Sequence, residues 1–480
     1  MKKWQSMIIT FMFACGVGLF LHSSQVSAAE KTYTIGTDVT YAPFEYQAED
    51  GKSYVGIDMD IMRAVAKEEG FKVDIKALGF NAAVQALEAN QIDGVMAGMT
   101  VSPERQVKFD FSESYYDAGV AMAVGTNSTI KSLDDLKGKK VAIKVGTSSA
   151  EFVNSIKKQY NITTTTFDDS SNMYDDVMTG NSVAAFDDKP VLAYGIKNGI
   201  KMKIVGETYE KGEYGFAVKK GTNKELLTKF NSGLKKLKAN GEYKKIVDKY
   251  TGTNAKCANS NSKSSRTILG LLKTNSGTLF DGFKQTMLLT IVAIVFATVL
   301  GIILGMMGVA PNKWLNGLSS TLIYIFRGLP LIVLAFFIYI GIPNLTGTKI
   351  PAFVAGIITL TLNEGAYTAA FVKGGIKAVD NGQMEAARSL GLPYGKAMMK
   401  VIMPQGIKIM IPSFINQFII TLKDTSILSV IGILELTQTG KIIIARNLEG
   451  FKMWLIIAVI YLVIITLLTW LSNLVERKIK

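Results

Sequence analysis

The sequence predicts an α/β domain followed by an all-α transmembrane domain with five helices. The chain has 480 residues, which is enough for more than one hydrophobic core. Up to about residue 253 it is polar and lysine-rich, whereas long apolar runs dominate from about residue 277. Strand-like and helix-like patterns alternate in the polar half, and five apolar runs in the second half are each long enough to cross about 30 Å of hydrocarbon.

The first 29 residues have the pattern of a secretory signal peptide. Lys2 and Lys3 form a basic region, Met7 to Leu21 is apolar, and small residues at 26–29 resemble a cleavage site. The apolar run is too short to span a bilayer comfortably. We therefore expect residues 1–29 to be removed, and the part that follows to lie outside the membrane.

Composition excludes several classes of protein. The formal net charge is +14, but no basic stripe with interleaved aromatics and no zinc-finger or helix-turn-helix pattern indicates a nucleic-acid binder. A basic surface facing anionic lipids or a cell wall explains the charge. Cys15, Cys257 and His22 are the only cysteines and histidine, and two of the three lie in the predicted signal peptide, so we expect neither a disulfide, nor a metal site, nor a bound cofactor.

The polar half, residues 30–253, reads as an α/β domain with parallel sheets, whose ligand lies at the carboxyl ends of strands. The predicted elements are strands at 33–37, 71–78, 93–97 and 140–145 and helices at 58–69, 82–89 and from about 146.

Two helix starts in this domain offer groups for an anion. Ser102 and Pro103 begin a helix, and the helix dipole disfavours Arg105 in its first turn unless an anion is shared with the free N–H groups. A carboxylate would suit this place, although Arg105 could equally form a surface ion pair. The segment Gly146-Thr147-Ser148 offers N–H and hydroxyl donors at a second helix start, a pattern that many helix caps share.

Other strand ends offer a carboxylate and aromatic walls. Asp187 and Asp188 follow an apolar stretch, where they could serve a ligand or simply a turn. Acidic and aromatic side chains that could line a site, or belong to the core, are Asp38, Tyr41, Phe44 and Phe80. An arginine, hydroxyls, an aspartate and aromatic walls together match a zwitterion, whose two charges must each be paired when buried.

The run from Ala97 to Arg105 (AGMTVSPER), followed by Phe109 to Tyr116 (FDFSESYY), resembles the signature of polar-amino-acid-binding proteins of ABC importers. The resemblance covers essentially all of 30–253. It implies a periplasmic-binding-protein fold, in which two α/β lobes joined by two crossing strands close on ligand like a flytrap. We expect the crossings near 117–124 and 214–218.

The resemblance also implies residue roles. Arg105, with Thr100 and Thr147, would hold the ligand carboxylate. Asp188, with the Gly98 carbonyl, would hold the ammonium, between walls formed by Tyr41 and Phe80.

Lys144 and Asp38 fall where glutamine-type binders have a matching pair. A lysine at the mouth of the site would repel arginine or lysine ligands and suits an amide or a carboxylate. Glutamine is therefore the first expectation, followed by glutamate, asparagine or aspartate. Alternatively, Lys144 points to solvent.

Residues 254–276 are rich in asparagine and serine and predict a flexible tether, which would keep the captured ligand at a high effective concentration near the membrane. The predicted membrane domain, 277–480, holds spans at about 283–309, 318–342, 350–372, 409–434 and 453–474. Basic residues concentrate in the 373–408 loop and in the tail, so the positive-inside rule places both in the cytoplasm. Five spans then place the first domain outside, as the signal peptide predicts independently.

The cytoplasmic loop contains a short predicted helix. Asp380 or Asn381 can cap it, Gly391 ends it, and Pro393 prevents its continuation. The segment 383–391 and its spacing to Pro404 resemble the EAA loop of ABC importer permeases. The resemblance implies docking on an ATPase subunit, and the residues that it assigns to coupling are Glu385, Ala386, Ala387 and Gly391.

The permease resemblance extends over about 280–475 and includes Phe326 to Leu331 and Leu422 to Ser426. Lys423 and Asp424 lie within a predicted span and need separate partners. Ala370 and Lys373 replace a glutamate and an arginine that are common in the family, and Glu364, one turn earlier, could compensate.

The chain lacks a phosphate-binding loop, because Gly391 to Lys396 is one residue short of the motif and Ala397 follows it. We therefore expect that the chain is not an enzyme, and that a separate subunit binds ATP and Mg²⁺ and hydrolyses ATP. The expected assembly is a permease homodimer with two ATPase subunits in a bacterial cell membrane. A ligand-gated channel or an amino-acid sensor with the same binding domain is the alternative.

Overall fold

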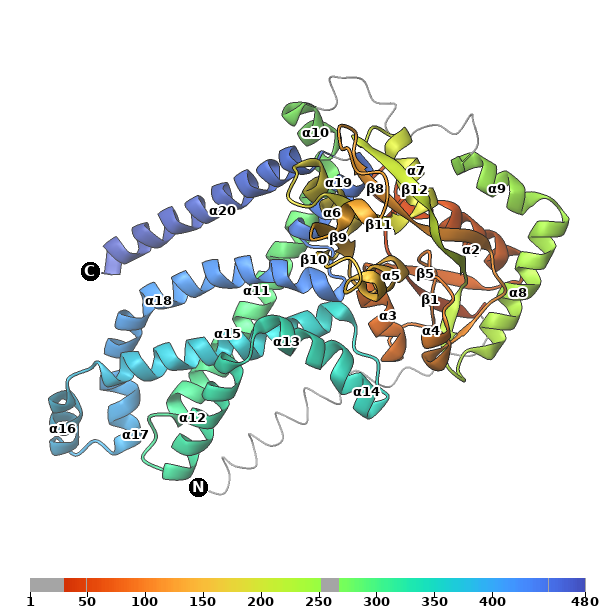
Figure 1. Ribbon diagram of the computed structural model, residues 1–480. Helices are drawn as coiled ribbons and strands as arrows, with labels where there is room; N and C mark the ends of the chain where they lie inside the picture. Colours follow the sequence, from red (N-terminus) through yellow and green to blue (C-terminus); the bar gives the residue numbers. More distant parts are fainter. Residues whose placement is uncertain (1–29, 49, 252–266, 448, 480) are drawn as a thin grey trace.

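The structure is a computed structural model, which describes residues 30–48, 50–251, 267–447 and 449–479. The predicted signal peptide and most of the predicted tether lie outside these residues. An α/β part with two lobes lies at one end of a bundle of long helices (Figure 1).

The first lobe, here called the N-lobe, contains a sheet of five strands. β1 pairs in parallel with β5 and β6, as predicted, but β13 runs antiparallel to β6 and β7. The prediction of purely parallel sheets was wrong because β13 enters this sheet from the other lobe rather than through a helical crossover. In sheet order, the strands are β5 (Lys72–Ala77), β1 (Thr32–Thr37), β6 (Gly94–Val95), β13 (Ala217–Lys219) and β7 (Phe109–Phe111).

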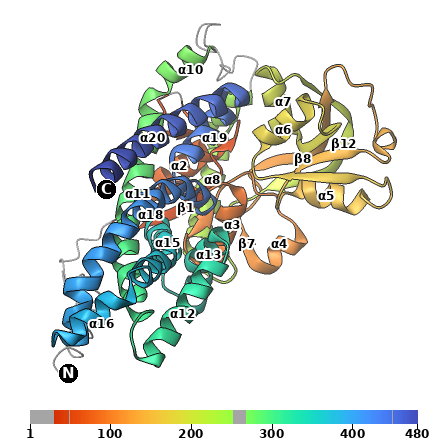
Figure 2. The same ribbon diagram turned by 90° about the vertical axis from the view of Figure 1, so that its left-hand side faces the viewer.

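The second lobe, the C-lobe, has the same plan. β9 pairs in parallel with β10 and β11, while β8 runs antiparallel to β11 and β12. The strand order is β10 (Thr163–Phe167), β9 (Lys140–Lys144), β11 (Ala184–Asp188), β8 (Tyr116–Gly125) and β12 (Met202–Tyr214). Figure 2 shows this lobe projecting to one side, and its helix α6 (Ser170–Met178) still contacts the helical second half of the chain.

Helices cover both sheets. Those of the N-lobe are α2 (Ile57–Glu68), α3 (Phe80–Glu88), α4 (Pro103–Lys108), α8 (Lys224–Ala239) and α9 (Glu242–Thr251), and those of the C-lobe are α5 (Ser148–Ile156), α6 (Ser170–Met178) and α7 (Lys189–Lys197). The N-lobe has a core of its own, the C-lobe has one on each side of its sheet, and one helix of the N-lobe, α3, packs into a core shared with the helical second half of the chain. A small antiparallel sheet of β2 (Thr40–Tyr41), β3 (Glu45–Gln47) and β4 (Tyr54–Val55) completes the N-lobe.

The chain crosses between the lobes twice, close to the two predicted places. One crossing lies between β7 and β8, the other between β12 and β13. The two crossings are hydrogen-bonded to each other, since Tyr115 N donates to Tyr214 O at 3.0 Å and Ser112 N donates to Phe216 O at 2.8 Å. This pair of neighbouring strands forms a hinge between the lobes.

The second half is helical, as predicted. Its helices are α10 (Ile268–Thr274), α11 (Ser276–Met307), α12 (Lys313–Gly328), α13 (Leu331–Phe336), α14 (Ile342–Thr346), α15 (Ala352–Lys377), α16 (Asn381–Ser389), α17 (Tyr394–Ala397), α18 (Met403–Asp424), α19 (Leu436–Asn447) and α20 (Gly450–Ile479). Within the described residues, three helical stretches are long and apolar enough to cross a membrane: 276–307, 394–431 and 450–474.

The second and third predicted spans differ from simple apolar helices. Residues 313–346 form a pair of helical segments bent by 102°, which together qualify as one further span. α15 covers the third predicted span and packs against α11, α12 and α18, and it is more polar because its interior face carries Asn363 and Glu364. Gln417 on α18 donates a hydrogen bond to Glu364. The polar face of α15 therefore points into protein.

The fourth predicted span ends differently from the expectation. α18 stops at Asp424 and a 3-10 helix, Thr425–Ile431, follows it. The sequence pattern also missed α19, whose apolar residues continue those of the preceding span.

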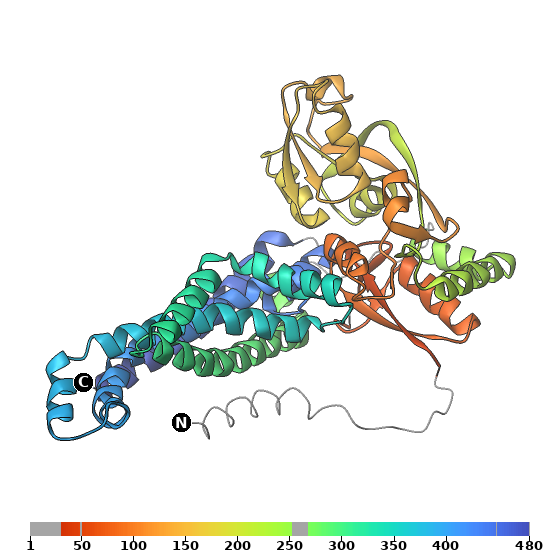
Figure 3. The same ribbon diagram turned by 90° about the horizontal axis from the view of Figure 1, so that it is seen from below.

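The two halves are in contact. Gln91 of the N-lobe donates through Nε2 to Tyr339 O and accepts from Ile350 N, both at 3.0 Å. Asp93 pairs with Lys349 at 3.1 Å. Seen from below, both lobes lie at the same end of the bundle, opposite α16 (Figure 3).

Candidate functional site

The predicted ligand residues meet in a cleft between the lobes, at the carboxyl ends of β1, β9 and β11. Asp38 follows β1, while Lys144 and Asp188 end β9 and β11. Of the nine predicted residues, all except Asp38 line a single cavity: Tyr41, Phe80, Gly98, Thr100, Arg105, Lys144, Thr147 and Asp188. Residues from Tyr41 to Asp188, far apart in the chain, thus meet in one cavity.

Arg105 points from the N-lobe across the cleft. Ser102 caps α4 by accepting from Arg105 N at 3.4 Å, as predicted. The guanidinium donates to Thr100 O at 2.8 Å and, in the other lobe, to Gly146 O at 2.9 Å. It lies over the ring of Phe80, 5.5 Å from the centroid. Arg105 also forms an ion pair with Glu151 of the C-lobe, 3.5 Å away, but only 11% of the Arg105 side chain is exposed, so most of it lies in the cleft and not on the surface.

Asp188 lies on the opposite wall and accepts hydrogen bonds from several hydroxyl groups. The Tyr41 hydroxyl is 2.9 Å from Asp188 Oδ2 and 3.0 Å from Asp187 Oδ1, and Tyr214 also donates to Asp188. Ser149 Oγ donates to Asp188 Oδ1 at 3.3 Å. Burial, together with the neighbouring charge of Asp187, raises the pKa of Asp188 to about 6. Among the residues that the structure describes, no lysine or arginine forms an ion pair with Asp188, so its hydrogen-bond partners are hydroxyl groups.

Lys144 and Asp38 form an ion pair across the lobes. Lys144 Nζ lies 2.5 Å from Asp38 Oδ2, and each side chain is only 2% exposed. Burial alone would raise the pKa of Asp38, but the charge and hydrogen bond of Lys144 hold it below its usual value. Burial would likewise lower the pKa of Lys144, and Asp38 reverses that effect. Both groups are charged, which a buried pair permits.

The cleft is closed. Arg105 to Gly146, Tyr41 to Asp188 and Lys144 to Asp38 all join the two lobes, and Thr100 Oγ1 lies 3.1 Å from Ser148 Oγ. The remaining cavity has a volume of about 10 Å³, so the lobes must separate before a small molecule can enter. Thr147 acts as a helix cap here, because its hydroxyl accepts from Ala150 N at 3.2 Å and donates to Lys144 O at 2.8 Å.

Gly98 is held from behind by a buried acid. Its φ of +53° suits glycine, and a Cβ would lie 2.9 Å from the Tyr41 ring. Asp58 Oδ2 accepts from Gly98 N at 2.9 Å and from the Tyr115 hydroxyl at 2.7 Å, which links the cleft to the hinge. Burial raises the pKa of Asp58 to about 6. Burial and the charge of Asp58 raise the pKa of neighbouring Glu45 well above its usual value.

Comparison with known proteins divides the chain in the same way. Residues 33–253 match the bacterial extracellular solute-binding proteins, family 3, and residues 297–480 match the binding-protein-dependent transport system inner membrane component. A probable glutamine ABC transporter permease protein, GlnM of Bacillus subtilis (strain 168), is 34% identical over 212 residues, which make up 44% of this chain and 98% of the relative.

The chain belongs to the polar-amino-acid ABC importers. The arginine-binding extracellular protein ArtP of Bacillus subtilis (strain 168) is 32% identical over 256 residues, 52% of this chain and 98% of the relative. The second substrate-binding domain of an amino-acid transporter from Streptococcus pneumoniae Canada MDR_19A is 47% identical, covering 46% of this chain and 99% of that one, with a TM-score of 0.36.

Family membership identifies the importer chain as a fused binding and permease protein, not an enzyme, and decides against a channel or a sensor. The segment Gly146-Thr147-Ser148 was predicted to offer donors, and Ser148 does line the cleft, but Ser149 and Tyr214 were not predicted as site residues. The two serines were visible as part of a helix start, but their contacts with Thr100 and Asp188 depend on lobe closure.

The predicted coupling residues of the importer lie on and beside α16. Asp380 caps the helix by accepting from Gly382 N, and Gly391 follows its end with a φ of +84°. Glu385 and Ala386 are exposed, whereas Ala387 packs against its own domain. Leu390, at the end of α16, is 84% exposed, so this end of the helix presents an apolar side chain.

Proposed function

We propose that the importer takes up glutamine, with glutamate, asparagine or aspartate as the next candidates. The observation that carries this proposal is the buried ion pair of Lys144 and Asp38 beside the cleft. Together with Arg105 it places two cations around a small site. A ligand with a cationic side chain would bring a third cation beside Lys144, whose neighbouring carboxylate Asp38 is already paired, and this is costly in a buried site.

The groups that close the cleft are those that a zwitterion would need once the lobes open. Arg105 exchanges the Gly146 carbonyl for a carboxylate, which can accept two charged hydrogen bonds. Asp188 exchanges the Tyr41 hydroxyl for an ammonium group. Thr100 and Thr147 add hydroxyl groups, the Gly98 carbonyl adds an acceptor, and the rings of Tyr41 and Phe80 form the walls.

The two relatives described above are named for different amino acids, glutamine for the permease and arginine for the binding protein. The ligand therefore has to be determined by measurement on this chain. The test is a binding measurement with the purified full chain against the twenty amino acids. Glutamine is expected to bind most tightly. Preferential binding of arginine or lysine would contradict the proposed specificity while leaving the importer in place.

We further propose the five-span topology, with the bent pair 313–346 counted as one span and α15 as another. Basic residues at the α16 end support a cytoplasmic position for that end. The two lobes lie at the opposite end of the bundle, which supports an external position for them.

The partners belong to the same proposal. The exposed side of α16, with Glu385 and Leu390, suits docking into a groove of a cytoplasmic ATPase subunit, which would bind ATP and Mg²⁺. Two copies of the chain, each with its own pair of lobes, would form the permease dimer.

A further inference from the structure

Two acidic side chains lie buried together behind the cleft. Glu45 on β3 and Asp58 on α2 are both completely buried, and neither lines the cleft cavity. Their carboxyl groups are hydrogen-bonded to each other, which requires that one of the two carries a proton. We call Glu45 and Asp58 the acid pair.

The two members of the acid pair have different partners. Asp58 Oδ2 accepts from Gly98 N at 2.9 Å and from the Tyr115 hydroxyl at 2.7 Å. Within the described part of the chain, no N–H or hydroxyl group donates to either carboxyl oxygen of Glu45 or to Asp58 Oδ1. Buried oxygens without a donor are costly, and two adjacent buried charges are more costly still. A proton between the two carboxyl groups removes both costs.

The partners also decide which acid is neutral. Two donors stabilise the charged form of Asp58, so that burial raises its pKa only to about 6. Burial and the charge of Asp58 raise the pKa of Glu45 well above its usual value. At neutral pH, therefore, Glu45 is the neutral member and donates to Asp58, which is ionised.

The surroundings leave this charge state in place. Other titratable groups that face the acid pair are Asp38 after β1, Lys144 on β9, Tyr115 in the hinge and Tyr243 on α9. Lys144 lowers the pKa of Glu45 and Asp38 raises it, so this ion pair acts in opposite directions. Burial raises the pKa of both phenols, which stay neutral. The acid pair thus carries a single negative charge.

That charge is attached to both the cleft and the hinge. Gly98 lines the cleft, and its carbonyl is proposed above to accept the ligand ammonium. Asp58 holds the Gly98 N–H from behind. The same carboxylate oxygen holds Tyr115, whose backbone N–H donates to Tyr214 O where the two crossings meet. Asp58 therefore fixes a backbone segment of the cleft relative to the hinge.

We propose that the acid pair, with one shared proton, positions Gly98 for the ligand ammonium and supplies the negative charge behind it. A neutral Glu45 satisfies Asp58 Oδ1 without adding a second buried charge. This inference rests on the proposed binding of an amino acid. Titration of the unaltered chain with the twenty amino acids tests that function separately: if none binds, the proposed function fails and the positioning role with it, and if another binds more tightly than glutamine, that amino acid becomes the probe.

The test makes the same chemical change at each acid of the purified full chain. At pH 7.5, Asp58→Asn removes the charge and is expected to raise the Kd of glutamine about tenfold. Glu45→Gln keeps a neutral donor, so its Kd should stay within about twofold of the unaltered chain. Normal binding by Asp58→Asn would overturn the proposal. Weakening by Glu45→Gln, alone or to the same extent, would overturn it as well, because Glu45 would then carry a charge.

Lowering the pH should remove most of the difference between Asp58→Asn and the unaltered chain. Below a pKa of about 6, Asp58 takes up a proton and resembles asparagine. The ratio of the two Kd values should therefore fall about threefold or more between pH 7.5 and pH 5. Asp188, whose pKa is also about 6, titrates in both proteins, so its effect cancels in the ratio. A constant ratio would mean that Asp58→Asn acts through packing alone, which would contradict the proposal.

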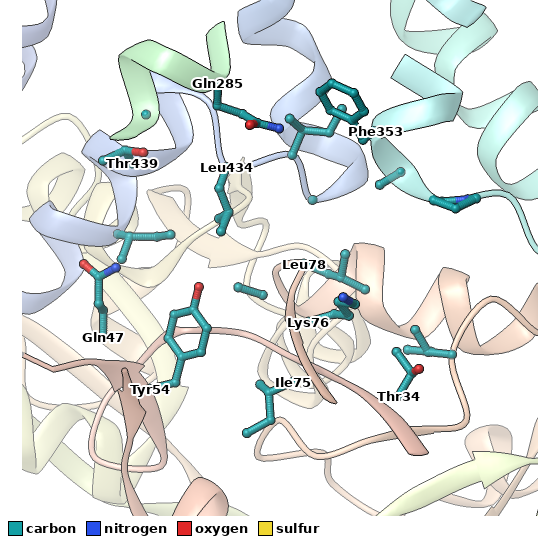
Figure 4. A pocket seen from close by; sticks show the side chains of 18 of the residues that line it. Thr34, Gln47, Tyr54, Ile75, Lys76, Leu78, Gln285, Phe353, Leu434 and Thr439 are labelled. Atoms are coloured by element: carbon teal, nitrogen blue, oxygen red, sulfur yellow. The ribbon is translucent and has the colours of Figure 1, made fainter. Parts of the chain in front are cut away.

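Two further variants separate hydrogen bonding from packing. Glu45→Leu cannot donate to Asp58 and should weaken binding as Asp58→Asn does. Gln47 on the same strand is also buried, but it faces a cavity of about 830 Å³ between the N-lobe and the permease (Figure 4), so Gln47→Leu is the matched control and should bind normally. Equal affinities of Glu45→Leu and Glu45→Gln, or equal weakening by Glu45→Leu and Gln47→Leu, would remove the positioning role. The comparison of Asp58→Asn with Glu45→Gln decides the proposal even if Glu45→Leu does not fold.

Discussion

At the scale of single residues, the cleft is notable for groups that satisfy each other across the lobes. Arg105 and Asp188 are both largely buried, and each uses a polar group of the opposite lobe as its partner. Burying such groups is tolerable only when they are paired. Closure around a ligand therefore requires ligand contacts of similar or greater strength in place of these.

Arg105→Ala should weaken glutamine binding by roughly 100-fold, about 3 kcal/mol, because hydrogen bonds to charged groups contribute about 1.5–3 kcal/mol each. Isothermal titration of the full chain measures the change. Arg63→Ala is the matched control, since Arg63 lies on the surface of α2, away from the cleft, where it donates to Tyr54 O and pairs with Asp60. Equal affinities in the two variants would remove Arg105 from the site.

Lys144→Gln should shift the preference from glutamine toward arginine. Removal of the lysine leaves Asp38 without its buried partner, so a cationic ligand side chain can pair with it. Competition binding with the two amino acids gives the ratio of the Kd for arginine to the Kd for glutamine. This ratio should fall at least tenfold. An unchanged ratio would mean that the ion pair only closes the lobes and does not select the ligand.

Glu45→Gln should make the protein less sensitive to alkaline pH. The raised pKa of Glu45 means that folding favours its neutral form, so its contribution to stability is complete below the ordinary carboxyl pKa and is lost as pH rises through the raised value. Glutamine mimics the neutral form at every pH. The Tm of the variant should exceed that of the unaltered chain by a margin that grows between pH 5 and pH 9.

A Tm difference that does not change with pH would contradict this account of Glu45. Glu242→Gln provides the control, because Glu242 is exposed on α9 and its replacement should leave the pH dependence of Tm unchanged.

At the scale of elements, the sequence correctly predicts the helices and strands that are determined by residues close together in the chain. The amphipathic pattern of α2 and the apolar run of β1 were found within a residue or two. The Ser102 cap was also predicted correctly, since an N-cap and its helix are neighbours in the chain. The antiparallel strands β8 and β13 were not, because their direction follows from the return of the chain between lobes.

Contacts that depend on lobe closure could not be predicted from local pattern. Tyr214 reaches Asp188 only because the second crossing passes the end of β11. The position of α19 could not be predicted for the same reason, because this helix packs against β2 and β3 of the N-lobe. The placement of Arg105, Asp188 and Lys144 in one cleft was predictable, because the family resemblance supplied the long-range information.

α16 is the element through which ATP hydrolysis should act. Glu385→Lys reverses an exposed charge on this helix and should abolish uptake while leaving glutamine affinity within twofold, because the cleft lies at the other end of the molecule. Uptake and binding are measured on the same preparation. Normal uptake by the variant would show that α16 does not couple the subunits.

At the scale of the whole molecule, one chain holds a closed cleft and a bundle of helices in direct contact. The N-lobe is fixed to the permease by Gln91 and by the ion pair of Asp93 with Lys349. The C-lobe is joined to the N-lobe through the two hinge strands. Because α6 of the C-lobe also contacts α19 and α20, opening of the cleft with the N-lobe held in place would break these contacts.

The most direct test of the central claim is uptake of radiolabelled glutamine into vesicles that contain the full chain with its ATPase. The account predicts accumulation against a gradient that requires ATP on the α16 side and is competed by unlabelled glutamine but not by arginine. Passive glutamine flux without ATP, or competition by arginine or lysine alone, would contradict it.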